Sequence, residues 1–512
     1  MTERTVRIAA GIFAPTPGWE SLLEQTGIDW FPVTDLRTIT PELCTLVICN
    51  TELDPHEMDA LRAYATTGGA VIFTSAAESV LRTAGTRSSI TSLPPAVRHD
   101  HWFTDVLDLH GPAWVFKDGS LVQSGPIGKG MISYFGADVE TVFTSEASTR
   151  KAFYAERKHL PHERTALRTR MPLRQMFLSH IGYLHHQRHL PFVHKWFYPR
   201  DSRSIFTFRI DSDKGTREEI EEIYALSEQY SVPTTWFLDV KSHEAWLERF
   251  RSFGGQEIAV HCYDHVIHPS SLLNRENFER ALMLLKKHGI DAAGIAAPTG
   301  AWRHSVGTAI RDLGFEYSSE FSYDYDDLPS FPRLNGVRSE SVQLPVHPTC
   351  IGTMRRERMG HDEMVRYFIR VTDRALALRE PVCLYHHPGH RTNSVFEEVF
   401  QYIRSTGVGM MTYREYAAWW KRRDAARIQC TWSGGVLRCS SSDVPQDQFL
   451  RIMFPDGSET ITAPNAAIDT GALERTTAPV LPAVPLDIMR TRQWRPAHLL
   501  QNVLDWWITT TE

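Results

Sequence analysis

Apolar and polar positions between residues 204 and 424 follow a pattern that predicts a repeated series of strands and helices. Helical segments carry apolar residues three or four positions apart, and short apolar runs of strand length separate them. The expected strands cover residues 205–210, 234–238, 257–260, 291–298 and 381–386. Repeated βα units favour an α/β fold, a distorted (β/α) barrel, with its chemistry at the carboxyl ends of the strands.

Residues 1–145 show the same alternation in a smaller unit. Apolar runs at 6–12, 46–50 and 71–73 predict strands, and Asp54 is placed to cap a helix between the last two. This order is typical of a doubly wound α/β domain. It resembles the flavodoxin-like and amidotransferase-like folds, but no cysteine follows the third run, where an amidotransferase nucleophile would stand. We therefore expect a non-catalytic domain that serves as a scaffold or binds a protein partner.

Two further segments complete the chain. Residues 146–203, rich in Arg, His and Pro, are predicted to be a connecting region: a solvated helical linker that packs on both neighbouring domains, in preference to a ligand-binding segment. Residues 425–512 change to short strands and turns, which predicts a small β-rich domain closed by a C-terminal helix at 497–507. Because single cores stop growing at roughly 250–300 residues, separate domains are expected.

Composition restricts the partners and the compartment. The formal net charge of −6 gives no reason to expect nucleic acid, and no run approaches the ~18 apolar residues of a membrane span. No signal peptide is seen, so a cytoplasmic protein is expected. The seven cysteines lack CxxC spacing and predict reduced thiols. Cys430 and Cys439 flank a Gly-Gly turn, where they could face each other across a hairpin.

The strand expected at 205–210 leads into the first candidate group of functional residues. Side chains alternate along a strand, so Arg209 and Asp211 share one face, and Asp213 follows two positions later. An arginine and a carboxylate inside an apolar strand are costly to bury unless they pair or bind a ligand. By itself, Asp-x-Asp is more often a turn at the end of a strand.

Histidines follow two other expected strands. His261 and His265 come directly after the run at 257–260, and two imidazoles at positions i and i+4 of a helical turn can bind one metal ion. Leu384 and His386 end the run at 381–386 and are expected to point inward together. Each histidine alone has a structural explanation, whereas all the groups together at strand ends predict a site.

Considered together, these groups resemble the polysaccharide deacetylase family, also called the NodB-homology family or carbohydrate esterase family 4, over residues 204–420. The resemblance lies in Arg209-Ile210-Asp211-Ser212-Asp213, His261-Cys262-Tyr263-Asp264-His265, Ala296-Ala297-Pro298-Thr299-Gly300 and Leu384-Tyr385-His386. It implies that Asp213, His261 and His265 bind a divalent metal, zinc first, with Co²⁺, Fe²⁺, Mn²⁺ or Ni²⁺ as alternatives. It also implies Asp211 as general base and His386 as general acid, with His387 left open for the second role.

Part of the family pattern is altered here. Ala296 stands where the family has an arginine beside the base, and our hypothesis is that Arg209 supplies that positive charge. The resemblance assigns an oxyanion contact to the backbone N–H of Thr299, and Trp302 is among the aromatic residues expected to stack on a sugar. For the family's Asp and Trp pair the candidates are Asp324, Asp326 and Asp327.

The resemblance implies a metal-dependent hydrolase that removes N-acetyl groups from an amino-sugar-containing carbohydrate. Two alternatives stay open. One is a related hydrolase of another linear or cyclic amide, which needs the same residues. The other is an inactive, deacetylase-like binding module.

Overall fold

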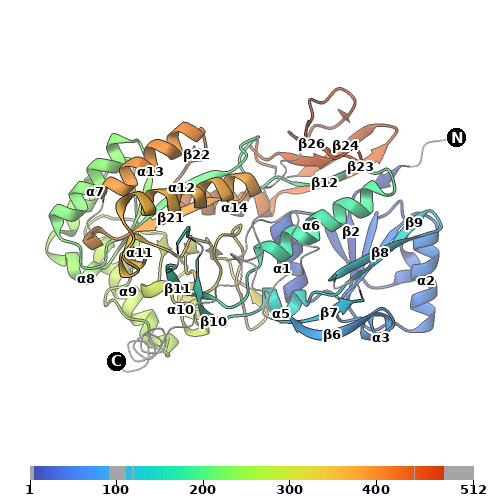
Figure 1. Cartoon of the computed structure of the whole chain (residues 1–512), viewed down its shortest axis with the longest axis horizontal. Helices are drawn as coiled ribbons and strands as arrows, with labels where there is room; N and C mark the ends of the chain where they lie inside the picture. The colour runs from blue at the N-terminus through green and yellow to red at the C-terminus, as the bar shows by residue number, and fades with distance from the viewer. Residues whose placement is uncertain are drawn as a thin grey trace.

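The computed structural model describes residues 5–90, 111–117, 120–153, 155–157, 159–390, 393–442 and 444–477. Figure 1 shows a barrel-like part, an N-terminal α/β part beside it, and a group of C-terminal strands that lies above helix α6. None of the helices in these ranges is long and apolar enough to cross a bilayer.

The barrel-like part is built on one parallel sheet of eight strands. Its order is β20 (Val342–Gln343), β17 (Tyr317–Ser318), β16 (Gly294–Ile295), β15 (Glu257–Val260), β14 (Thr234–Leu238), β13 (Ile205–Asp211) and β21 (Val382–His386), with β22 (Gly409–Met410) also on β13. Strands β20 and β21 end this path, so the sheet is curled but open. The prediction of an α/β fold with a curled parallel sheet is confirmed.

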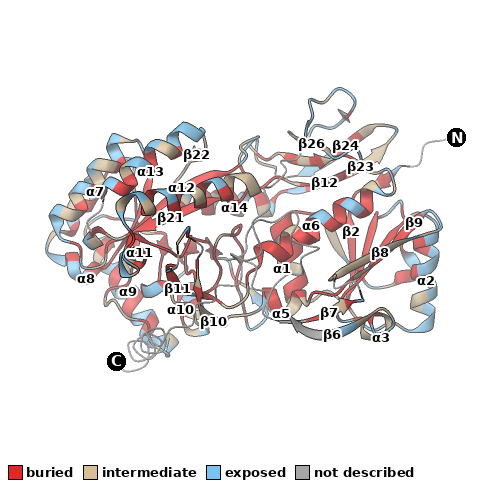
Figure 2. Ribbon diagram, in the orientation of Figure 1, coloured by how far each residue is buried: buried red, intermediate tan, exposed pale blue. Residues whose placement is uncertain are grey.

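Helices pack around the outside of this sheet. They include α7 (Arg217–Gln229), α9 (Ser271–Lys287), α10 (His304–Asp312), α12 (His361–Leu378), α13 (Asn393–Thr406) and α14 (Tyr413–Ala425). Capping boxes start α7 at Thr216 and α14 at Thr412. On the outer side of β13, the ring of Phe208 lies 4.8 Å from those of Phe396 and Phe400. The central strands are therefore buried on both faces (Figure 2).

The strand expected at 291–298 is much shorter in the structure. Only Gly294–Ile295 pair as β16. A side chain at Gly294 would meet the ring of Tyr317 at 1.9 Å, so this close approach of two strands requires glycine. Beyond Ile295 the chain turns into the short helix η3 (Pro298–Gly300) at the carboxyl edge of the sheet.

The N-terminal part has strands at the predicted runs 46–50 and 71–73 and a helix between them. Its sheet runs β3 (Trp30–Val33), β2 (Ala10–Phe13), β4 (Leu46–Cys49), β5 (Ala70–Phe73), β9 (Gly130–Phe135) and β8 (Val122–Ile127), parallel except for β8. Helices α1 (Pro17–Thr26) and α2 (Pro55–Thr66) connect its first strands, and Asp54 caps α2 as expected. The amidotransferase-like resemblance and the protein partner stay predictions.

The connecting region differs from its prediction. It forms a hairpin of β10 (Ser148–Ala152) and β11 (His162–Ala166), then α6 (Met171–His186) and β12 (Phe192–Lys195). Twelve of the 16 residues of α6 are buried. Arg174 on this helix is buried because it pairs with Asp327 and Glu380 of the barrel, at 2.6 Å each. The region therefore contains a helix that contacts both neighbouring parts, as expected, but this helix is buried and not solvated.

Distant segments complete the C-terminal sheets. The segment expected as one strand at 6–12 is split, because β1 (Val6–Arg7) pairs with β23 (Arg427–Ser433) while β2 stays in the N-terminal sheet. Strand β12 pairs with β25 (Leu450–Met453). The other strands here are β24 (Val436–Ser442), β26 (Ser458–Thr462), β27 (Ile468–Asp469) and β28 (Thr476–Thr477). Cys430 and Cys439 face each other, with their Sγ atoms 3.2 Å apart and unbonded. The helix expected at 497–507 lies outside the described residues.

Candidate metal and catalytic site

A cavity of about 770 Å³ opens at the carboxyl ends of the barrel strands. Its wall is made by the segments that follow β13, β15, β16 and β21, by the β10–β11 hairpin, and by α11 (Ile351–Arg356). The expected residues that line it are Asp211, Asp213, His261, His265, Thr299 and Trp302. His387 also lines it, and His386 does not.

Asp213, His261 and His265 converge on one point. The Oδ1 atom of Asp213 lies 3.4 Å from Nε2 of His261 and 3.3 Å from Nε2 of His265. Two ligands of a tetrahedral metal with bonds of ~2.1 Å are separated by about 3.4 Å, so this spacing fits a shared ion. His261 donates from Nδ1 to the carbonyl oxygen of Ala296 at 2.6 Å, which leaves the Nε2 lone pair directed at Asp213. The donor atoms therefore fit a cation.

The backbone at three strand ends adopts a left-handed conformation. The φ angles are 40° for Asp213, 68° for Cys262 and 58° for Thr299. Such conformations cost on the order of 1–3 kcal/mol each in non-glycine residues, and they cluster at functional sites. Asp213 and Cys262 each lie two residues beyond the end of a strand, and Thr299 lies four residues beyond the end of β16.

The segment from His261 to His265 is an irregular loop, so the expected helical turn is wrong. Asn277 of α9 holds it, because its Oδ1 accepts hydrogen bonds from the backbone N–H groups of Tyr263 at 3.0 Å and Asp264 at 2.7 Å. The two imidazole rings are nevertheless 5.0 Å apart. Asn277 was not anticipated from the sequence. It lies on the buried face of the amphipathic helix α9, and a polar residue on that face is the signal that could have indicated it.

Arg209 and Asp211 form a fully buried ion pair beside the metal-ligating group. Arg209 donates from Nε and Nη2 to the two carboxylate oxygens at 2.5 and 2.6 Å, and from Nη1 to the carbonyl oxygen of Ser319 at 2.6 Å. Burial raises the pKa of Asp211, but the charges of Arg209 and then His261 outweigh burial and hold it below its usual range. This geometry agrees with the hypothesis that Arg209 keeps the carboxylate ionised.

The structure places His387, not His386, beside the carboxylates. Nε2 of His387 is 3.6 Å from Oδ2 of Asp213 and 3.9 Å from Oδ2 of Asp211. Burial lowers the pKa of His387, but Asp213 and Cys350 outweigh burial and raise it to about 10. The ring of His386 instead packs 4.8 Å from that of Phe396 in the core.

Strand pairing explains this difference. Tyr385 is the register partner of Arg209, whose side chain is on the inner face with Asp211. Alternation therefore directs Tyr385 and His387 to the cavity and Leu384 and His386 to the outer helices. The expectation that Leu384 and His386 point inward is wrong, because it exchanged the inner and outer faces of β21.

Trp302 and the acidic residues expected for the fourth family motif have different surroundings. Trp302 lines the cavity and donates from Nε1 to Glu146 at 3.1 Å. The three acids instead lie in buried ion pairs away from the cavity: Asp324 with Arg170, Asp326 with His347 and Arg374, and Asp327 with Arg174. They connect the barrel to α6 and to α12, so the structure gives no counterpart of that motif among them.

Comparison with known proteins finds similarity to solved structures alone. No protein-family model matches the chain, and no curated protein matches it. A probable polysaccharide deacetylase from Pseudomonas aeruginosa PAO1 is 18% identical, with a TM-score of 0.37, over 43% of this chain and 92% of that one. The Puue allantoinase is 17% identical, with a TM-score of 0.37, over 44% and 92%.

A carbohydrate esterase family 4 pseudoenzyme from Bacillus anthracis is also similar. It is 16% identical, with a TM-score of 0.31, over 43% of this chain and 66% of its own. Part of this chain is thus similar in structure to a probable polysaccharide deacetylase and to this pseudoenzyme.

Proposed function

We propose that residues 204–424 form a metal-dependent hydrolase that removes N-acetyl groups from an amino-sugar-containing carbohydrate. The observation that carries this proposal is that two imidazole nitrogens each lie within 3.4 Å of one carboxylate oxygen on the wall of a cavity. A carboxylate held ionised and a third imidazole face the same point. Together these groups supply a cation site, a base and an acid.

Each protein group has a defined part in amide hydrolysis. Asp213, His261 and His265 would hold a divalent cation, zinc first. When bound, the cation supplies a Lewis acid that polarises the acetyl carbonyl and acidifies the attacking water. Asp211 takes a proton from that water as the new C–O bond forms, and Arg209 keeps it ionised between turnovers.

The C–N bond breaks as a proton reaches the nitrogen, and His387 is the proposed donor. Its position supports this role, because its Nε2 lies within 4 Å of both carboxylates while the His386 ring lies in the core. The backbone N–H of Thr299 would donate to the oxyanion of the tetrahedral intermediate. Trp302 would stack on the sugar ring. The products are acetate and the free amine.

Metal content and acetate release, measured on the same preparations, test the proposal. The wild type should hold at least one equivalent of zinc, cobalt or iron and release acetate from N-acetylglucosamine oligomers. Asp213→Ala and His261→Ala should each lose one equivalent of metal together with the activity, whereas Asn465→Ala, in a loop of the C-terminal part, should lose neither. Metal binding with cleavage of another amide alone would favour the related hydrolase, and absence of both metal and turnover would favour the binding module.

A further inference from the structure

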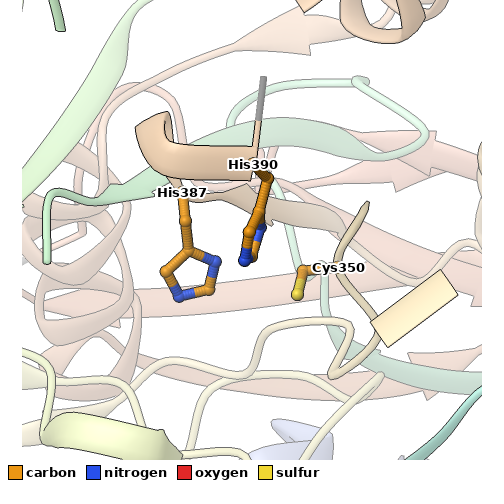
Figure 3. Close-up of side chains that lie close together, drawn as sticks. All are labelled: Cys350, His387 and His390. Carbon is orange, nitrogen blue, oxygen red and sulfur yellow. The ribbon is translucent and has the colours of Figure 1, made fainter. Parts of the chain in front are cut away.

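A second group of metal-ligating side chains lies on the wall of the same cavity. Among the described residues, the ligand atoms of Cys350, His387 and His390 lie within 4.8 Å of one another. Figure 3 shows the two imidazoles on one turn, with the Cys350 side chain reaching them from a facing segment. We propose that this triad is a second metal site, for a thiophilic divalent cation, distinct from the site of Asp213, His261 and His265.

Two segments far apart in the sequence are fastened together to build this triad. Cys350 directly precedes α11, while His387 and His390 belong to the turn after β21, which includes η4 (Pro388–His390). Tyr385 donates its hydroxyl to the carbonyl oxygen of Pro348 at 2.9 Å, and Arg355 donates from Nη1 to that of His390 at 2.6 Å. The positions of the three ligands are therefore set by contacts on both sides.

Gly352 lets His390 lie against the first turn of α11. A Cβ atom at Gly352 would come within 2.3 Å of Cε1 and 2.4 Å of Nε2 of His390. The imidazole thus occupies the space that any other residue would fill with its side chain. This close approach brings the ring of His390 near Cys350, which lies two residues before Gly352.

The ligand types favour a particular class of ion. A thiolate and two imidazoles suit Zn²⁺ and related ions, with a fourth position for water or substrate. Bonds of ~2.3 Å to sulfur and ~2.1 Å to nitrogen would draw the ligand atoms to about 3.4–3.8 Å, which small side-chain rotations achieve. The first group has an oxygen and two nitrogens and no sulfur, so the two sites differ in spectroscopic signature.

His387 is both a ligand of this triad and the proposed general acid, which gives the second site a consequence for activity. A cation held by this ring together with Cys350 and His390 would restrain it from delivering a proton to the substrate. Cation in excess of the first equivalent should therefore inhibit turnover. This consequence rests on the proposed function, whereas binding at the triad does not.

Titration of the metal-free protein with Co²⁺, followed by absorption, tests the binding. The wild type should take up two equivalents and develop a thiolate-to-cobalt charge-transfer band. Cys350→Ser should take up one equivalent without the band, and Asp213→Ala should keep the band. Cys430→Ser is the matched control, because it removes one thiol of the pair on the β23–β24 hairpin and leaves the triad intact.

Two further variants guard against a failure of Cys350→Ser to fold. His390→Gln removes a ligand, and Gly352→Ala keeps all three while displacing His390, so each should weaken cobalt binding at the triad by about 10–100-fold. A wild-type titration that ends at one equivalent without the band would overturn the proposal, as would a band that survives in Cys350→Ser. An enzyme without deacetylase activity that still shows the band would refute the proposed function alone.

A separate observation concerns the basic rim of the cavity. Five arginines line it: Arg150, Arg164, Arg303, Arg355 and Arg356. Arg150 and Arg164 stand directly opposite each other across the β10–β11 hairpin. Side chains directly opposite each other on a hairpin have Cβ atoms about 4.5–5.5 Å apart, so the two guanidinium groups can reach one anion. Glu163, the acid on this rim, is 3.3 Å from Arg356.

From this rim we infer that the acetamido sugar bound here carries a phosphate or a carboxylate, an inference that rests on the proposed function. Guanidinium groups bind either anion through paired, charge-assisted hydrogen bonds. The two arginines of the hairpin lie outside the barrel strands, so they can select a substrate without taking part in the chemistry.

Calorimetric binding separates this inference from the catalytic one, because it needs no turnover. N-acetylglucosamine 1-phosphate or N-acetylmuramic acid should bind at least ten times more tightly than neutral N-acetylglucosamine, and the tighter of the two identifies the anion. Arg150→Ala and Arg164→Ala should remove that preference, whereas Arg438→Ala on the remote strand β24 should keep it. Equal affinities for charged and neutral sugars would overturn the inference.

Discussion

Replacing Arg209 by methionine should leave the carboxylate of Asp211 buried without its charged partner. The Arg209 side chain is 0% exposed and that of Asp211 is 4% exposed, so water cannot take over the lost hydrogen bonds. Methionine keeps most of the side-chain length, and it still packs between the rings of Phe237 and Tyr385 that flank the guanidinium. The perturbation is therefore the loss of charge and of donors.

The size of the effect follows from the buried geometry. Removing one member of a buried ion pair costs about 3–5 kcal/mol, because the other charge stays desolvated. Arg209→Met should lower the free energy of unfolding by this amount. The double variant with Asp211→Asn should recover part of the loss, with a coupling energy of up to ~3 kcal/mol.

Activity should change for a related reason. Without the positive charge the pKa of Asp211 rises, so the base becomes protonated at higher pH and the acidic limb of the pH–rate profile moves upward. Urea denaturation followed by circular dichroism measures the stability, and acetate release from pH 5 to 9 measures the profile. If Arg209→Met kept both the wild-type midpoint and the wild-type acidic limb, the assignment of Arg209 as the partner of the base would be refuted.

Three further predictions address the acid, a buried carboxyl and the metal. His387→Gln should lower kcat by about 10²–10⁴-fold, as expected for a lost general acid, whereas His386→Gln should chiefly lower stability. If His386→Gln lost more acetate release than His387→Gln, His386 would be the general acid. Burial raises the pKa of Glu320 from 4.5 to about 7. Between these two pH values the folded state therefore binds more protons than the unfolded chain. The free energy of unfolding should fall by about 3 kcal/mol as the pH rises from 4.5 to 7. Glu320→Gln should abolish that fall in urea midpoints between pH 4 and 8, and an unchanged slope would contradict the burial argument. Chelation should lower the free energy of unfolding of the wild type by about 2.7 kcal/mol more than that of Asp213→Ala, for metal at 100 times its Kd. Equal losses in the two proteins would place this metal elsewhere.

Local patterns in the sequence were sufficient for much of the fold. Apolar runs and capping residues indicated strands β13, β14, β15 and β21 and the starts of several helices, because strand and helix periodicities are properties of short segments. In a parallel βα series the carboxyl ends of the strands meet at one edge. That rule placed the groups after β13 and β15 at one edge, and the resemblance to the polysaccharide deacetylase family implied that Asp213, His261 and His265 bind one metal. In the structure their ligand atoms lie within 4.8 Å of one another.

Other features depended on relations between distant segments. The sequence does not define which side chains of β21 point inward, because this depends on the register of β21 with Arg209. His386 was therefore expected in the cavity, whereas His387 lines it. The burial of Arg174 needed acids about 150 to 200 residues away. No sequence motif indicates Cys350 as a ligand, and nothing in the sequence around Gly352 indicates that the imidazole of His390 fills the space beside it.

Residue types and their order along the chain thus determined the fold class and the chemical character of the site, since both follow from short-range periodicity and from the chemistry of carboxylates and imidazoles. Tertiary structure alone decided which of two adjacent histidines faces the carboxylates, which charges are buried as pairs, and that a cysteine meets two histidines on the cavity wall. Each of these depends on strand register and helix packing, where a shift of one residue exchanges the inner and outer faces of a strand.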